Sequence, residues 1–397
     1  MTVRVNKPSL NIREKLSELE RPIGLKGSEL MRSETAQEAR DFVSAGRKNM
    51  IINGDCRVDQ RGTDFTNNAG SIYSLDRWHT HVYALGSARY RVEKSSDAPD
   101  GFHYSIKYSC TAINATPDVN HQMFSNLKIE ANDINHLNFY QSNPNTVTIS
   151  FFVKTNLAGT QSAALKLSNN NSGHTNGATR SYNFTYTVNK PDTWEKKTKT
   201  ITLDSSTAYS KSSPTSFGMS IDFWTAAGTS RRQATANSWV NNTNNATDSN
   251  NLNFIGSTNN YVNFTGVQIE VGKNATEFEH RPYGEELALC QRYYAKIRLA
   301  NQEWIYNEAN TSNHKWHWAN VPFSMRTNPS VDVTDVSTGG SVSGLSGTIS
   351  SLTPQSPGDT PGRISSRLAM SATGGTARYM YHTDAWNSDY IALNAEL

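Results

Sequence analysis

Residues 146–154 read TVTISFFVK, and this stretch decides the fold class. Hydrophobic and polar residues alternate with a period of two, and β-branched and aromatic residues dominate, which is typical of a half-buried β-strand. Similar segments, separated by Asn-, Gly- and Ser-rich loops such as NNNSGHTNGATR, lie at residues 163–167, 182–188, 198–203, 217–224 and 261–271. Many short strands without intervening helices predict a large antiparallel β-sandwich over residues 48–284.

Composition sets the protein class. The chain has 397 residues, of which 36% are hydrophobic and 18% charged. It is therefore too long for one compact core and too apolar for a disordered protein, and two or three domains are expected. Lys and Arg number 38 against 35 Asp and Glu, and a net charge of +3 is too small a basic field to indicate nucleic acid as a partner.

Membrane insertion and disulfide bonding are not expected. The first residues, MTVRVNKPSL, show no secretory signal, and no later stretch is apolar for long enough to span a bilayer. The three cysteines, Cys56, Cys110 and Cys290, are odd in number, far apart and outside any C-x-x-C spacing. They are interpreted as small buried thiols rather than as a disulfide framework or a zinc site.

Residues 1–47 differ from the rest of the chain. Asn11 with Glu14, and Thr35 with Glu38, have the spacing of capping boxes, and each pair precedes a short amphipathic segment. Two short helices without a core of their own are marginally stable in water, so they need a partner. We interpret residues 1–47 as an N-terminal helical anchor arm. The alternative is a helix pair folded against its own β domain.

The third predicted part, residues 285–397, begins with a linker helix. The sequence GEELALCQRYYAKI places Leu287, Cys290 and Tyr294 near one face of a helix over residues 285–297. Strand-like segments follow at residues 303–306, 315–325, 330–336, 364–370, 378–382 and 390–393. The Gly- and Ser-rich stretch at 337–351 is expected to form turns. These features predict a smaller C-terminal β-sandwich, and the fold class as a whole is mainly β.

Several stretches together resemble the tail fibres of marine tailed bacteriophages, particularly those of cyanobacteria and related hosts. They are RPIGLKGSELMRSETAQEAR (21–40), NMIINGDCRVDQRGTDF (49–65), YSLDRWH (73–79), FTGVQIEVGKNATEFEHRPYGEELALCQRYY (264–294) and LNAEL (393–397). Their order along the chain also matches these fibres. The sequence departs from the commonest opening at Cys56, where such fibres usually carry Phe.

The resemblance implies a jelly-roll module similar to carbohydrate-binding modules, in a homotrimer located in the virion and made in the cytoplasm of the bacterial host. It places residues 1–47 toward the tail, on a tail or adaptor/nozzle protein, and the C-terminal domain toward the host. The predicted function is adhesion to the host cell surface, with a surface polysaccharide as the expected receptor. The alternatives are a polysaccharide-degrading tailspike enzyme and a structural protein that bridges tail parts.

Receptor-contact candidates lie in the C-terminal part. His314, Trp316 and Trp318 are spaced i, i+2, i+4, so a strand would direct all three side chains to the same side. Aromatic residues with adjacent polar groups suit sugars, and Trp304 and Trp386 extend the set. The competing interpretation is that Trp316 and Trp318 form the inner face of a small sandwich.

The segment around Trp78 offers two further sites, each with a structural alternative. Trp78 could stack on a pyranose ring, although a tryptophan at the start of an apolar strand is more often in the core. His79 and His81 share one face of a strand, which could hold a transition metal on a three-fold axis. Histidines on a sheet face without a metal are the favoured interpretation.

Catalysis has little support in the sequence. Asp97 and Asp100 lie in a turn-like stretch, and Glu285 and Glu286 open a helix, so neither pair is arranged for acid and base roles. No nucleophile elbow, metalloprotease helix or phosphate-binding loop is present. We therefore expect a binding protein without enzymatic activity and without a cofactor.

Overall fold

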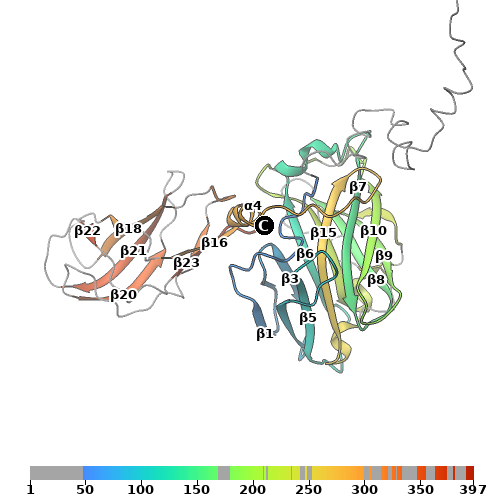
Figure 1. The fold of residues 1–397 in the computed structure, drawn as a ribbon, viewed down its shortest axis with the longest axis horizontal. Coiled ribbons are helices and arrows are strands. Elements are labelled where there is room, and N and C mark those ends of the chain that lie inside the picture. Colours follow the sequence, from blue (N-terminus) through green and yellow to red (C-terminus); the bar gives the residue numbers. More distant parts are fainter. Residues whose placement is uncertain are drawn as a thin grey trace, which may run out of the picture.

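The computed structural model describes residues 48–168, 179–208, 210–211, 213–233, 235–241, 246–247, 253–298, 304–305, 314–320, 324–327, 329–332, 347–354, 363–372, 379–380 and 390–397. The anchor arm predicted for residues 1–47 lies outside these ranges. Figure 1 shows a large β-sandwich and a smaller β portion, with helix α4 (Tyr283–Gln291) at the point where they meet.

Two large sheets form the sandwich. The six-stranded sheet has the order β1 (Asp64–Asn68), β4 (Arg89–Ser95), β5 (Ser105–Ala112), β15 (Tyr261–Val271), β7 (Thr146–Thr155), β10 (Glu195–Thr202). The seven-stranded sheet has the order β13 (Ser238–Asn241), β9 (Thr179–Val188), β8 (Gly159–Ser168), β11 (Phe217–Ala227), β6 (Gln122–Glu130), β3 (Trp78–Tyr83), β2 (Ile72–Tyr73). Neighbouring strands in both sheets are antiparallel, which confirms the predicted sandwich.

Short elements complete this part of the chain. Strands β12 (Arg232–Gln233) and β14 (Ala246–Thr247) pair in parallel. Three 3-10 helices lie at Asn132–Leu137, Thr229–Arg231 and Phe254–Gly256.

The core lies between the two sheets, and the strand pattern seen in the sequence accounts for it. On β7, Val147, Ile149, Phe151 and Val153 are at most 1% exposed, while the residues between them face outward. The ring of Phe151 lies 4.8 Å from that of Phe223 on the opposite sheet. Burial of these alternating apolar side chains supplies the main free energy that holds the sheets together.

The linker helix is shorter than predicted. We expected a helix over residues 285–297, but α4 ends at Gln291, and Tyr294–Arg298 form strand β16. This strand pairs with β23 (Tyr390–Asn394), and β19 (Ser330–Asp332) pairs with the other edge of β23. The aromatic and β-branched residues after Arg292 favour a strand once a partner is available, and the partner comes from the far end of the chain.

The smaller β portion contains the remaining strands. These are β17 (Trp304–Ile305) with β22 (Tyr379–Met380), and β18 (His314–Asn320) with β21 (Arg363–Ala372) and β20 (Gly347–Pro354). Part of the stretch at 337–351 was expected to form turns, and this was wrong for residues 347–351, which belong to β20. The pairing of Ile349 with Met370 and of Leu352 with Leu368 explains the difference, because a partner strand compensates for the poor strand propensity of the Gly and Ser residues.

The last residues of the chain return to the large sandwich. The carboxylate of Glu396 pairs with Arg77 and lies 3.1 Å from the guanidinium of Arg61. The Tyr73 hydroxyl donates a hydrogen bond to the backbone oxygen of Leu397 at 2.5 Å, and the Arg326 side chain donates to the backbone oxygen of Glu396 at 2.9 Å. The smaller β portion is therefore attached to the sandwich through both α4 and the residues after β23.

Candidate functional site

The outer face of the six-stranded sheet carries a group of aromatic and charged side chains, which we call the Trp194–Tyr261 strip. It consists of Asp97, Lys154, Asp192, Trp194 and Tyr261. Sheet order brings them together, because β15 and β10 both pair with β7. Lys154 is the outward neighbour of buried Val153 on β7, and Tyr261 is the outward neighbour of buried Val262 at the start of β15.

The indole of Trp194 is fixed through its polar edge. Its Nε1 donates a hydrogen bond to Asp97 Oδ1 at 2.9 Å, and Lys154 Nζ lies 2.8 Å from Asp97 Oδ2. The Asp97 side chain is 44% exposed, that of Lys154 is 20% exposed, and Trp194 is half-buried. Partial burial alone would raise the pKa of Asp97, but the hydrogen bonds from Lys154 and Trp194 lower it below its usual value. The carboxylate is therefore charged at neutral pH.

The second aromatic ring, Tyr261, is held in the same way. Its hydroxyl donates a hydrogen bond to Asp192 Oδ1 at 2.5 Å. Burial raises the pKa of Tyr261, and the charges of Asp192 and Asp97 raise it further. Lys107 Nζ lies 5.7 Å from the centre of the Tyr261 ring.

The loop that carries Trp194 is ordered by Glu195. One oxygen of Glu195 accepts the backbone N–H groups of Asn189 and Lys190, both at 2.8 Å, and the other accepts the side chain of Asn189. Desolvation alone would raise the pKa of Glu195. These hydrogen bonds and the contact with Lys197 outweigh that effect and lower the pKa to about 2. Asp192 N–H also bonds to the Thr155 carbonyl at 2.9 Å. The connection from β9 to β10, which passes from one sheet to the other, thus presents Trp194 from a fixed position.

Such an arrangement suits a carbohydrate ligand. The apolar C–H face of a sugar ring can stack on a partly exposed indole or phenol, and the sugar hydroxyls need donors and acceptors around it. Each carboxylate oxygen has two lone pairs, so Asp97 and Asp192 retain acceptor capacity beyond the bonds described. Lys154 and Lys107 supply donors. Because both rings are positioned beforehand, little ordering entropy is lost when a ligand binds.

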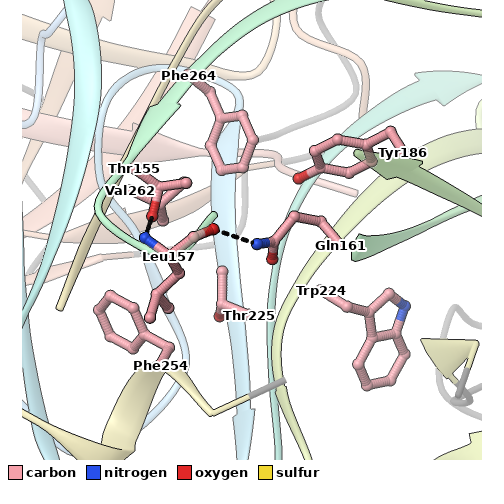
Figure 2. A pocket seen from close by; sticks show the side chains of 9 residues that line it. All are labelled: Thr155, Leu157, Gln161, Tyr186, Trp224, Thr225, Phe254, Val262 and Phe264. Atoms are coloured by element: carbon pink, nitrogen blue, oxygen red, sulfur yellow. Dashed lines mark hydrogen bonds between the residues drawn. The ribbon is translucent and has the colours of Figure 1, made fainter. Parts of the chain in front are cut away.

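A pocket between the sheets does not provide an alternative sugar site. Figure 2 shows its lining, in which Gln161 Nε2 donates to the Leu157 carbonyl at 2.7 Å and which also includes Trp224, Tyr186 and Phe264. The cavity has a volume of about 10 Å³. This is room for about one water molecule, not for a pyranose.

Trp78 lies in the core, as its favoured interpretation predicted, and His79 and His81 lie on one sheet face. Trp78 is fully buried, and its indole Nε1 donates to the Asn53 carbonyl at 2.9 Å, so its core role is confirmed. His79 and His81 share the outer face of β3, where the His81 ring stacks on Phe124 at 4.7 Å. Burial, reinforced by nearby positive charges, lowers the pKa of His79 to about 3 and that of His81 to about 4, so both are neutral near pH 7.

The C-terminal receptor-contact candidates are placed only as backbone. Trp304 belongs to β17, and β18 contains Trp316 and Trp318, which pair in register with Arg367 and Ser365. Trp386 lies outside the described residues. The assignment of these tryptophans to receptor contact stays a prediction.

Two of the carboxylates noted in the sequence hold other groups in place. Asp97 positions Trp194, and Glu286 is buried, where it accepts the Asn53 N–H at 2.5 Å and pairs with Arg281 at 3.3 Å. The three cysteines are buried free thiols, as predicted. In the part of the chain that the structure describes, no group of three or more His, Cys, Asp or Glu side chains could hold a metal ion, and no helix is long and apolar enough to cross a membrane.

Sequence reasoning did not identify Trp194 and Tyr261 as site residues. The turn sequence NKPDTW at residues 189–194 marks a Pro-Asp turn just before a strand, which places a tryptophan directly before that strand. That pattern could have identified Trp194. Its partners Asp97 and Tyr261 are distant in sequence, and their approach depends on sheet order alone.

Comparisons with known proteins give distant similarities. No family model matches the sequence, and no curated protein does. Among solved structures, the enzymatically active domain of tailspike protein 4 of bacteriophage CBA120 is 12% identical, with 56% of this chain and 21% of that chain covered and a TM-score of 0.29. The CBM22-1 xylan-binding domain of Paenibacillus barcinonensis Xyn10C is 12% identical, covering 58% and 100%, with a TM-score of 0.25.

A third solved structure, of CBM4, is 16% identical, covering 56% of this chain and 99% of that chain, with a TM-score of 0.27. The matched part of this chain spans about a fifth of the length of the tailspike chain. Similarities this distant identify neither a family nor a ligand.

Proposed function

We propose that this protein is a tail fibre of a tailed bacteriophage and that it attaches the virion to surface polysaccharide of the host cell without cleaving it. The observation that carries the proposal is the Trp194–Tyr261 strip. Two partly exposed aromatic rings are each held by a carboxylate, at 2.9 Å and 2.5 Å, with lysine donors beside them. The virion assignment is supported by the resemblance of the sequence segments to tail fibres.

The proposed mechanism is adhesion by avidity. The strip offers two partly exposed rings on the outer face of a sheet, so one sugar chain bound to one copy is expected to dissociate readily. In a homotrimer anchored through residues 1–47, three strips act on one cell surface, and the second and third contacts form at a high effective concentration. Weak individual contacts then suffice for firm attachment.

Substitution of the two rings tests the proposal. Full-length protein is incubated with phage-sensitive cells before infection, and binding to polysaccharide purified from those cells is measured in parallel. Trp194→Ala and Tyr261→Ala should each reduce polysaccharide binding and blocking of phage adsorption at least about tenfold, since one lost stacking contact is worth about 1 kcal/mol or more in each of three copies.

The matched control is Trp239→Ala. Trp239 is also half-buried, and its indole Nε1 donates to the Thr202 carbonyl at 2.9 Å, but it lies on β13 at the edge of the other sheet. This variant should bind as the wild type does. Equal binding by all variants would contradict the site. Release of soluble sugar from the polysaccharide would instead favour a tailspike enzyme.

A further inference from the structure

A lysine and an aspartate meet on the outer face of the seven-stranded sheet. Lys166 lies on β8 and Asp222 on the neighbouring strand β11, and Lys166 Nζ is 2.6 Å from Asp222 Oδ2. Both side chains are 0% exposed. The proposed glycan site, on the opposite sheet, does not use this pair.

Two aromatic rings lie next to the amine, and the neighbouring strands place buried Asn126 opposite Asp222 and buried Ser181 opposite Lys166. Lys166 Nζ lies 4.8 Å from the centre of the Phe124 ring and 5.7 Å from that of Trp224, and these two rings contact each other at 4.6 Å. Phe124 and Trp224 are at most 1% exposed. The Ser220 hydroxyl donates a hydrogen bond to Asp222 Oδ1 at 2.8 Å. Water is thus excluded from the pair, and one carboxylate oxygen is held by a hydroxyl donor.

Burial changes the relative free energies of the possible states of this pair. In water, an amine and a carboxylic acid remain ionised, and hydration of the two ions prevents condensation. Burial removes that hydration, which costs several kcal/mol for each ion. Transfer of a proton from the ammonium to the carboxylate gives a neutral amine beside a neutral acid, and these two groups can form an amide. Fixed contact of reacting groups raises their effective molarity to on the order of 10⁵ M or more.

We propose that Lys166 and Asp222 form an intramolecular isopeptide bond. The ammonium proton moves to Asp222 Oδ2, and the freed Nζ attacks Asp222 Cγ. The Ser220 hydroxyl stabilises the negative charge that develops on Oδ1. The second Nζ proton passes to the hydroxyl group on Cγ, the C–Oδ2 bond breaks, and one water molecule leaves. An Nζ–Cγ amide remains, and no oxidant or further reactant is consumed.

The bond would link β8 covalently to β11. It would close the chain between Lys166 and Asp222 into a loop. A covalent link of this kind stabilises a fold chiefly by restricting the unfolded chain, as a disulfide does. Unlike a disulfide, it is insensitive to reductants. It also removes two buried charges, which would otherwise have to be accommodated out of contact with water.

Intact-mass spectrometry of the purified full-length protein tests the proposal. Near-ultraviolet circular dichroism first confirms that the protein is folded, and the mass is then measured after denaturation. The wild type should be lighter than its calculated mass by one water molecule, and a peptide map should show one branched peptide containing both residues. A folded wild type at its full calculated mass, with two separate linear peptides, would overturn the proposal.

Variants distinguish the isopeptide from other losses of water. Lys166→Met and Asp222→Ala should each have their full calculated masses, because each lacks one reacting group. Asp222→Asn keeps a reactive carbonyl and loses ammonia instead, so a folded Asp222→Asn protein should be lighter by one ammonia molecule. Loss of water that persists in Lys166→Met would place the dehydration elsewhere and would likewise overturn the assignment.

Discussion

Substitution of Glu396 by alanine should destabilise the whole large sandwich, although Glu396 lies close to the end of the printed sequence. Its side chain is 4% exposed, and its two partners, Arg77 and Arg61, are 2% and 9% exposed. Burial acts to lower the pKa of Arg77, and the charge of Glu396 outweighs it and raises that pKa above its ordinary value. The carboxylate therefore compensates two guanidinium groups that have little access to water.

The expected magnitude follows from the burial of the pair. Removal of one partner from a buried ion pair costs about 3–5 kcal/mol, because the other charge stays buried without compensation. For a domain of about 150–250 residues, each kcal/mol lowers the melting temperature by about 2–4 °C. Glu396→Ala should therefore lower the melting temperature by about 6–20 °C, in a scan followed by near-ultraviolet circular dichroism.

The matched control is Asp64→Ala. Asp64 also pairs with an arginine, Arg91, at 2.8 Å, but the two side chains are 45% and 36% exposed. An exposed pair contributes little, so this variant should melt close to the wild type. If Glu396→Ala lowers the melting temperature no more than Asp64→Ala does, the reasoning is refuted. The residues after β23 would then not unfold together with the sandwich.

Three further predictions concern pH, attachment and assembly. Burial raises the pKa of Asp76 to about 6, above its unfolded value, so ionisation of Asp76 lowers the free energy of unfolding as pH rises from about 4 to 6, by at most about 3 kcal/mol. Asp76→Asn should show a smaller fall over that range in urea titrations, and an unchanged slope would contradict the prediction. Deletion of residues 1–47 should leave a folded β protein that no longer enters virions, and normal incorporation would argue against the anchor assignment. Light scattering under reducing conditions should give a trimer, and a stable micromolar monomer would count against it.

The strands could be predicted wherever local sequence determines them. In β7 and β15, β-branched and aromatic residues alternate with polar ones, and the structure places both strands where the pattern indicated. The same period of two placed His79 and His81 on one face. These features can be predicted without knowing the partner strand, because residues that alternate along a strand point to opposite faces of the sheet.

The errors arose where a distant strand decides the local structure. Residues 347–351 are rich in Gly and Ser, yet they form part of β20 because β21 supplies a partner. Residues 294–298 leave the helical pattern because β23 returns to pair with them. The candidate site was missed for the same reason. Trp194, Asp97 and Tyr261 meet through sheet order, which no local pattern encodes.

Strand β15 lies between the point where residue 48 enters the sandwich and the Trp194–Tyr261 strip, so it would carry the load on a fibre. The chain enters the sandwich beside β15, where Met50 N–H bonds to the Ile269 carbonyl at 2.9 Å and Asn49 N–H bonds to Glu279 Oε2 at 2.6 Å. Tyr261 begins the same strand at its other end. With the arm attached to a tail and a glycan held on the strip, as proposed, tension runs along β15. That strand is paired on both sides, with β5 and with β7, and the load is therefore shared by two ladders of hydrogen bonds rather than by loops.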